Sequence, residues 1–455
     1  MKKAYLFLFT LLMVATMQSN AQQQYAGYRS SDRMGVNGVF FNPAYIAGNR
    51  FKWDVNVFSI NAGVGNNNNK FALKGIGSII KNADSLLYTS TGNNRLNALA
   101  NVDFLGPSAM MQLDEKSAVA ITTRVRAVVN VLDYDSRLIN SIRQQVSFST
   151  FPYSISSSNN QGTRINAWTE IGASYARVFS GDPAHTFKLG LTLKYLRGTG
   201  SAYVNINSLR ATLDRDGSGT YVTDATGSIA TSSAVDFENL KFNELLRSTG
   251  SGIGGDLGLI YEFRPNGYNS IDAQNGYKLK LGLAVLDVGG ITYKNDPQYY
   301  SNYTMNIPAG DKLYLEQFSE KNIDEVKQIL DADVRFTKIA GGNNRIALPT
   351  TLLADADYHI SQNIYTNLAV QLGLSAKDKI QNPYYYGNVT LTPRFENKTF
   401  GVYVPLNYNP LTHFNAGLSL RAGPFFIGSG SFFTLAAGQS KQMDFHMGVR
   451  FGELQ

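Results

Sequence analysis

The chain has 455 residues, with 41 lysines and arginines against 34 aspartates and glutamates, and a net charge of +7. This excess of positive charge is modest for a chain of this length and gives no indication of nucleic-acid binding. The chain has no cysteine, which excludes a small fold held together by disulfides. Its 26 tyrosines, 26 phenylalanines and 42 glycines, with only 16% charged residues, favour β structure over helix.

Residues 1–21 have the pattern of a cleavable signal peptide. Two lysines follow the initial methionine, and the run 4–17 is apolar and uncharged. That run is too short to span a membrane as a permanent helix. The small residues at 19–21 predict cleavage after Ala21, and therefore export.

The segment 22–50, which follows the signal, predicts a plug rather than a strand. It is too irregular for a strand and too apolar for a free tail, so we expect it to bury itself inside the fold that follows. Pro43 fixes its own φ and biases Asn42 away from helix, while Ala44 is small enough for close approach to a wall. We therefore expect a turn at these three residues that carries Phe40 and Phe41 inward, as a gate.

Beyond residue 21, no stretch of about eighteen apolar residues recurs, and the mean hydropathy is −0.18. These observations exclude a helical membrane protein. They do not exclude a transmembrane β-barrel, because only every second residue of a barrel strand faces lipid.

Strict alternation marks the strands. In the segment 443–451, the odd positions are Met, Phe, Met, Val and Phe, and the even positions are Asp, His, Gly and Arg. One face of the strand is therefore apolar, and the other carries polar side chains or glycine. The same pattern predicts an all-β fold, a transmembrane antiparallel β-barrel of about fourteen strands within residues 51–455. The predicted strands are 51–65, 96–113, 117–131, 166–179, 186–206, 254–264, 276–293, 347–360, 363–375, 386–396, 398–407, 412–422, 424–434 and 442–451.

Short and long connections alternate along the chain. The long ones, 66–95, 132–165, 207–253 and 294–346, are rich in Asn, Ser, Gly and Tyr. Outer-membrane barrels have short periplasmic turns and longer external loops, so the alternation of short and long connections favours a barrel over a soluble β-sandwich. Within the last long loop, Asn322 and Glu325 predict a capping box at the start of a short amphipathic helix that ends near Leu330.

Charged residues on the predicted inward faces alternate in sign from strand to strand. We interpret them chiefly as ion pairs that fix packing and register in the lumen, with ligand coordination as the alternative. On this pattern, we expect Leu191→Arg on the lipid face to cost far more stability than Lys194→Gln on the lumen face. The charged residues are Arg124, Arg126, Glu170, Lys188, Lys194, Asp256, Glu262, Lys278, Lys280, Asp355 and Asp357.

The run Phe40-Phe41-Asn42-Pro43-Ala44 resembles a motif of the long-chain fatty-acid outer-membrane transporter family. In that family, fourteen strands surround a small N-terminal hatch with an Asn-Pro-Ala motif after an aromatic pair. The segments 254–263 and 281–293 also resemble its barrel strands. Runs such as 390–395 and 421–429 resemble uncharacterised outer-membrane barrels of the phylum that runs type IX secretion. The resemblance covers nearly the whole mature chain and implies the fold; we carry over no ligand-pocket residue.

The four histidines do not cluster in sequence or predicted depth, so we expect no metal site and no Ser-His catalytic pair. Asp355 and Asp357 share a strand face, as any residues two apart on a strand do. The sequence thus predicts neither an enzyme nor a cofactor.

Two functions from different classes follow from the sequence. The first is a transporter that passes a hydrophobic or amphipathic small molecule across the outer membrane. The second is a barrel whose external loops dock a secreted or cell-surface protein, as in a secretion or gliding complex of the type IX kind. In both, the barrel wall contacts outer-membrane lipid.

Overall fold

The computed structural model describes residues 24–75, 95–136, 138, 151–157, 161–182, 184–233, 250–265, 276–293, 300–339, 345–377, 379 and 381–454. The predicted signal peptide, 1–21, lies outside these ranges. Among the described residues, no helix is long and apolar enough to cross a membrane.

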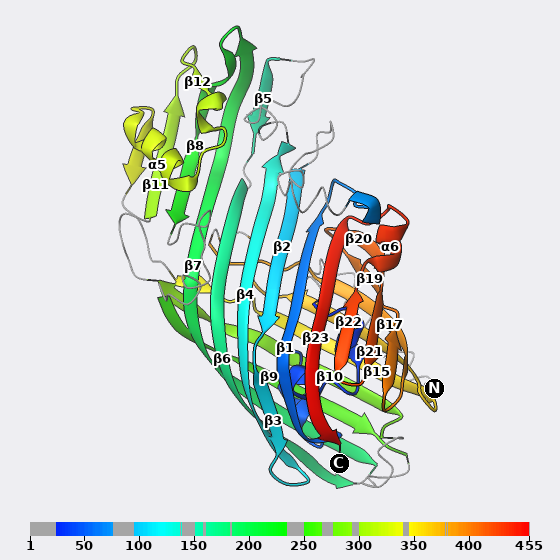
Figure 1. Ribbon diagram of the computed structural model, residues 1–455. Helices are drawn as coiled ribbons and strands as arrows, with labels where there is room; N and C mark the ends of the chain where they lie inside the picture. Colours follow the sequence, from blue (N-terminus) through cyan, green and yellow to red (C-terminus); the bar gives the residue numbers. More distant parts are fainter. Residues whose placement is uncertain are drawn as a thin grey trace.

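The strands form a closed antiparallel barrel with fourteen positions in its wall (Figure 1). Each position pairs with its neighbours in chain order, and the first strand pairs with the last, which closes the sheet. The predicted fold class is therefore confirmed. In order, the wall consists of β1 (Phe51–Asn66), β2 (Arg95–Leu105) with β3 (Ser108–Gln112), β4 (Ser117–Asp135), β6 (Gln161–Asp182), β7 (His185–Asp216), β9 (Gly250–Phe263), β10 (Leu279–Tyr293), β14 (Arg345–Ala347) with β15 (Thr351–Ser361), β16 (Ile364–Gly373), β17 (Asn388–Glu396), β18 (Phe400–Tyr403) with β19 (Leu406–Asn409), β20 (His413–Ala416) with β21 (Leu418–Ala422), β22 (Phe425–Ser429) and β23 (Gln442–Leu454).

Four wall positions that the sequence predicted as continuous strands are interrupted. Pro107, Pro349 and Pro405 lie in three of the interruptions, and Gly417 forms the fourth. Proline cannot donate to a strand ladder, so pairing stops at these points and resumes beyond them. The predicted strand 424–434 is also too long, because β22 ends at Ser429 and a short helix, α6 (Phe432–Ala436), follows.

The outer surface of the wall is apolar where it faces lipid. On β7, Leu191 and Leu193 are 47% and 64% exposed, whereas Lys188, Thr192 and Lys194 between and beside them are buried. This alternation places apolar side chains outside and polar ones inside, the arrangement of a transmembrane barrel. A closed barrel with this surface belongs in the outer membrane.

Beyond one end of the wall, the sheet continues as an outward extension, opposite the end where the C-terminus lies (Figure 1). The extension sheet has the order β5 (Tyr153–Ser156), the outer part of β7, β8 (Gly219–Ser233), β11 (Tyr300–Ile307) and β13 (Phe336–Ile339), with β12 (Leu313–Tyr314) also on β8. The sequence had predicted long irregular loops here. Their described parts are instead largely strands, because β7 does not stop at the wall but runs to Asp216.

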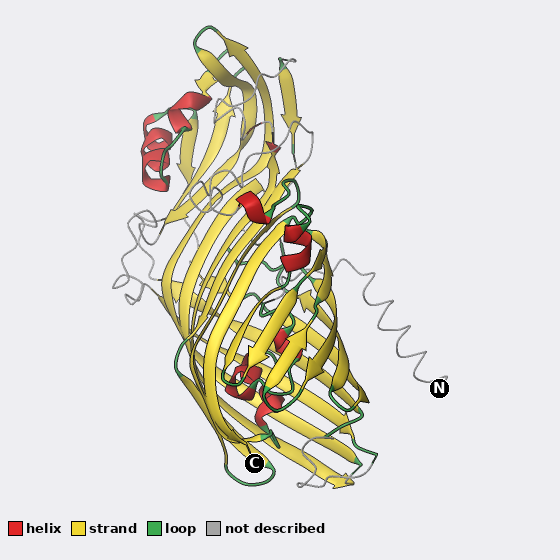
Figure 2. Ribbon diagram, turned by 45° about the vertical axis from the view of Figure 1, so that its right-hand side comes forward, coloured by secondary structure: helices red, strands yellow, loops and turns green. Residues whose placement is uncertain are grey.

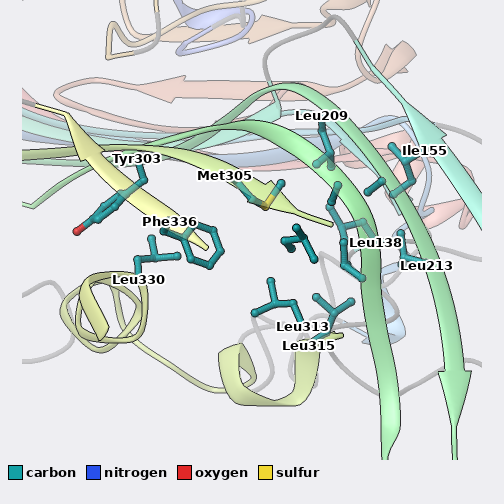
Figure 3. Close-up of a cluster of buried hydrophobic side chains, with 14 residues drawn as sticks. Leu138, Ile155, Leu209, Leu213, Tyr303, Met305, Leu313, Leu315, Leu330 and Phe336 are labelled. Carbon is teal, nitrogen blue, oxygen red and sulfur yellow. The ribbon is translucent and has the colours of Figure 1, made fainter. Parts of the chain in front are cut away.

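The extension has its own hydrophobic core, in which the 3-10 helix η7 (Leu315–Phe318) and the helix α5 (Ile323–Ala332) cover one face of the sheet. Leu330 of α5 packs with Phe336, Tyr303 and Met305 of the neighbouring strands (Figure 3). The predicted helix is confirmed, and so is its capping box. The Asn322 side chain accepts from the Glu325 amide at 2.9 Å, and the Glu325 carboxylate accepts from the Asn322 amide at 3.0 Å.

Candidate functional site: the barrel lumen

Residues 24–50 lie inside the barrel as three short 3-10 helices joined by turns (Figure 2). The helices are η1 (Tyr28–Ser30), η2 (Gly35–Phe40) and η3 (Pro43–Ile46), and almost every residue of the segment is buried. None of these residues joins the strand ladder. The segment is held by side-chain contacts with the wall, and we call it the inner segment.

Asn42 fixes the turn that the sequence singled out. Its backbone is extended, and its side-chain oxygen accepts from the Ala44 amide at 3.0 Å, which caps η3. Its side-chain amide donates to the carbonyls of Leu259 on β9 at 3.1 Å and Leu283 on β10 at 3.4 Å. One residue therefore both shapes the turn and attaches it to the wall.

Two wall glycines make room for this turn. A Cβ at Gly190 on β7 would overlap the backbone of Pro43 and Ala44, and a Cβ at Gly258 on β9 would overlap the side chain of Asn42. Gly190 and Gly258 are paired across their strands, so the two positions form one depression in the inner wall. Only glycine allows the backbone of the inner segment to approach so closely.

Phe40 and Phe41 have different surroundings. The guanidinium of Arg124 lies 5.3 Å from the centre of the Phe40 ring. Phe41 is less buried, packs against Leu353 and meets Tyr25 edge to face, with ring centres 6.1 Å apart. The two rings thus have different neighbours: Phe40 lies beneath a wall arginine, and Phe41 lines two small cavities.

Two small cavities lie on either side of Phe41. One, of about 40 Å³, is bounded by the inner segment and by Lys280 and Asp355 of the wall; the other, of about 20 Å³, extends toward Arg126. Phe41, Arg29 and Leu353 line both cavities and so separate them. Volumes of this size hold one or a few water molecules. Neither cavity is large enough to hold a larger molecule.

Above the inner segment, five charged residues, one from each of five strands, form what we call the charge cluster, Arg126, Glu170, Lys194, Asp256 and Asp287. The Arg126 guanidinium contacts Asp287 at 2.7 Å and Glu170 at 3.1 Å. The Lys194 ammonium contacts Asp287 at 2.7 Å, Asp256 at 2.8 Å and Glu170 at 3.6 Å. All five are buried, so the cluster ties the neighbouring strands β4, β6, β7, β9 and β10 together on one side of the lumen.

Other residues of the predicted charge set form separate pairs. Lys188 contacts Glu262 at 2.8 Å, and Arg264 approaches the same carboxylate at 2.5 Å. Arg124 binds Asp103 at 2.5 Å, a partner that the sequence analysis did not single out. These pairs lie between neighbouring strands, where they hold register.

Lys280 and Asp357 connect the wall to the inner segment. Lys280 contacts Asp32 of the inner segment at 3.0 Å and Asp357 at 3.7 Å. Asp32 is also bound by Arg50 at 2.6 Å, and Arg394 holds Asp357 at 2.7 Å. A chain of opposite charges thus runs from β17 through β15 and β10 to the inner segment.

Two predicted lumen residues differ from the rest. Lys278 does not face the lumen as predicted: its ammonium donates to the carbonyls of His359 and Ile360 and lies over the outward ring of Tyr358. The reason is that it precedes β10, where the alternation of faces has not begun. Asp355 faces the lumen, accepts from Asn367 at 3.3 Å and lines the larger cavity.

Glu396 and Arg394 are lumen residues that the sequence analysis missed. The Glu396 carboxylate accepts from the hydroxyl of Ser31 and, at 3.0 Å, from the amide of Asp32. Both residues are buried in the lumen, two apart on β17. The sequence could have indicated these two residues, because the polar positions of the alternating pattern in that strand include an arginine and a glutamate.

Fold and lumen together define a class, a transmembrane β-barrel whose interior is occupied by its own N-terminal segment. The chain belongs to a family described as a family of unknown function (DUF5723), whose model matches residues 43–430. No curated protein matches the chain.

Among solved structures, the chain is similar to the toluene transporter TbuX from Ralstonia pickettii, with 10% identity over 93% of this chain and 94% of that one and a TM-score of 0.41. It is also similar to a Pseudomonas aeruginosa FadL homologue, with 10% identity over 95% and 99% and a TM-score of 0.34. The translocator domain of the autotransporter NalP from Neisseria meningitidis matches with 8% identity over 88% of each chain and a TM-score of 0.34.

Proposed function

We propose that this protein passes a hydrophobic or amphipathic small molecule across the outer membrane, with the inner segment as a hatch that must move before the molecule can pass. The observation that carries the proposal is the way the inner segment is held. It fills the lumen, yet it is bound by side chains rather than by strand pairing, and its described residues join the wall covalently only where Arg50 meets Phe51. A segment held in this way can leave without breaking the barrel.

The cavities on either side of Phe41 support an amphipathic molecule in particular. The apolar side chains of Phe41 and Leu353 lie beside the cation of Arg29 in both cavities. A molecule with an apolar body and one polar group would find both kinds of contact there. We assign gating to Phe41, with Phe40 as its support and Asn42, Pro43 and Ala44 as the turn that positions both rings.

A disulfide that ties the inner segment to the wall tests the proposal. An ideal Cβ at Gly430 would lie 2.7 Å from the Cβ of Ala26, somewhat closer than the roughly 3.5 to 4.5 Å of a disulfide. A shift of about 1 Å therefore suffices for the pair Ala26→Cys with Gly430→Cys. The chain has no cysteine of its own, so no other thiol competes.

The assay follows two fluorescent probes, apolar N-phenyl-1-naphthylamine and amphipathic pyrenebutyrate, into vesicles that contain the oxidised or reduced double variant. We expect uptake through the wild-type barrel, loss of uptake in the oxidised variant, and recovery after reduction. Each single cysteine variant is the matched control and should transport in both redox states. Equal uptake by the oxidised and reduced double variant, or no uptake by the wild type above protein-free vesicles, would contradict the proposal.

One observation favours protein docking as a second candidate function. Val334, at the turn between α5 and β13 in the extension, is 96% exposed beside an open groove of about 650 Å³. The groove is lined by charges of both signs, among them Lys312 and Asp333. Val334→Glu should abolish a stoichiometric complex isolated from native membranes if docking is the function, and should leave probe uptake unchanged.

A further inference from the structure

We infer that the barrel has a second seal at its outer mouth, formed by residues 381–386, and that this outer lid closes the lumen independently of the inner segment. The lid belongs to the connection between β16 and β17. It includes three consecutive tyrosines, Tyr384, Tyr385 and Tyr386, all of them buried. A connection at the rim of a barrel ordinarily lies in water, so three buried tyrosines there require a partner surface.

That surface is the far side of the barrel. Asn130 on β4 pairs with the backbone of Tyr384 in both directions: its side-chain amide donates to the carbonyl at 2.7 Å, and its oxygen accepts from the amide at 2.9 Å. Arg164 on β6 donates to the carbonyl of Asn382 at 3.1 Å, and Asn166 donates to that of Gln381 at 3.3 Å. β4 and β16 are six wall positions apart in the ring of fourteen, so the lid crosses the lumen.

These bonds satisfy a backbone that has no strand partner of its own. Buried peptide groups that lose their partners cost about 1 to 3 kcal/mol each, so wall side chains at fixed positions must supply them. Asn130 and Arg164 are almost fully buried; Asn130 bonds Tyr384 of the lid, and Arg164 bonds Asn382 of the lid and the carbonyl of Lys377 in the same connection. The wall is therefore built to hold the lid inside the mouth.

The lid also contacts the charge cluster below it. The Arg126 guanidinium donates to the hydroxyl of Tyr385 at 3.0 Å, and the Tyr386 hydroxyl donates to Asn97 on β2 at 3.1 Å. Arg126 is at the same time paired with Asp287 and Glu170. Movement of Tyr385 thus removes a partner from the central cation of the lumen.

Apolar side chains from the surrounding strands complete the seal. They pack with the three tyrosines as a single hydrophobic cluster across the mouth, and close packing of this kind leaves few voids as large as a water molecule. The other members are Leu99, Val128, Leu132, Trp168, Leu196, Ile291, Tyr293, Ile346, Leu348 and Leu411. The lumen is consequently closed twice, by the outer lid and by the inner segment, with the two small cavities below the lid.

Two seals in series predict that removal of either one leaves the barrel closed. The test measures the conductance of the full-length protein and three variants in planar bilayers. One variant lacks residues 22–39. The second replaces residues 381–386 by an equal number of glycines and serines, and the third combines both changes. We expect the wild type and both single variants to be closed, and the combined variant to show stepwise conductance.

A second variant covers the case in which the replaced lid disturbs folding. Asn130→Ala with Arg164→Ala removes wall anchors of the lid and keeps the tyrosine cluster intact. Combined with the deletion of residues 22–39, it should also open the barrel. Asn56→Ala is the matched control, because Asn56 is a buried inward asparagine that bonds the carbonyls of Leu105 and Gly106 instead of the lid.

The heat-dependent shift of folded barrels on detergent gels checks that every variant is folded. Full conductance after deletion of residues 22–39 alone would overturn the lid as a seal, and a folded combined variant that stays closed would overturn it as well. Neither result depends on probe uptake, so the failure of this inference is distinguishable from the failure of the proposed hatch.

Discussion

Replacement of Lys194 by glutamine should destabilise the barrel far more than the alternation pattern of the sequence suggests. The Lys194 ammonium contacts three carboxylates, those of Asp287, Asp256 and Glu170. Without it, Arg126 still contacts Asp287 and Glu170, but Asp256 loses its ion-pair partner. Removing one partner of a buried ion pair typically costs about 3 to 5 kcal/mol, because the remaining charge stays buried without compensation. We expect a loss of this size in the free energy of unfolding.

Lys188→Gln is the matched control for this prediction. Lys188 lies on the same strand and the same face and is equally buried. Its partner Glu262, however, keeps the Arg264 guanidinium at 2.5 Å. The control should therefore lose less stability than the Lys194 variant. Adding Asp256→Asn to Lys194→Gln should restore part of the loss, because it removes the carboxylate that was left without a cation.

The measurement is denaturant-induced unfolding of the barrel in lipid vesicles, followed by tryptophan fluorescence. The chain has two tryptophans, and Trp168 lies 4.9 Å from the Arg126 guanidinium, so the signal reports on the cluster itself. Equal losses for Lys194→Gln and Lys188→Gln, or no rescue by Asp256→Asn, would refute the argument from uncompensated charge.

Three further predictions concern the wall, the depression and the extension. Leu191→Arg, near the middle of the lipid-facing side of β7, should cost about 2 to 4 kcal/mol in the same vesicle assay, and a cost near zero would contradict the assigned face. Gly190→Val should displace the turn at Ala44 while the barrel stays folded, seen as faster proteolysis of the inner segment; unchanged protection would show that the wall yields instead. Asn322→Ala should weaken helix α5 by about 1 kcal/mol, measured by amide hydrogen exchange, and unaltered exchange would mean that packing alone holds the helix.

Strand positions were predictable from the sequence because they rest on a local property. Alternation along β7 or β23 needs only the residues of that strand, and it places Lys188, Lys194 and their neighbours on one face. Ion-pair partners were harder to predict. Glu170 lies directly opposite Arg124 in the sheet, yet it pairs with Arg126, while Arg124 turns to Asp103. The alternation of residues along a strand determines which face a side chain is on. A long charged side chain can, however, reach several diagonal neighbours on that face, so alternation does not determine its partner.

The outer lid and the extension carried no local signal of this kind. Three consecutive tyrosines do not alternate, and the groups that bury them, such as Asn130 and Arg164, lie more than two hundred residues away in the sequence. The sequence analysis did not predict the outer half of β7, for a different reason. Many of its residues are small or polar, as in a surface loop, and the core against which its Leu209, Ala211 and Leu213 pack is completed by distant parts of the chain, such as Leu330 and Phe336.

The inner segment also contacts both strands that close the barrel. It begins its contacts beside the seam where the first and last strands meet: the Val36 amide donates to Asp54 on β1 at 2.7 Å, and Arg450 on β23 binds the carbonyl of Arg33. The same segment reaches β9 through Asn42. Strands that are far apart in the sequence thus contact the same inner segment, and the pairing of β1 with β23 encloses it. The inner segment thereby links the two closing edges of the sheet from inside the lumen, in addition to their backbone pairing.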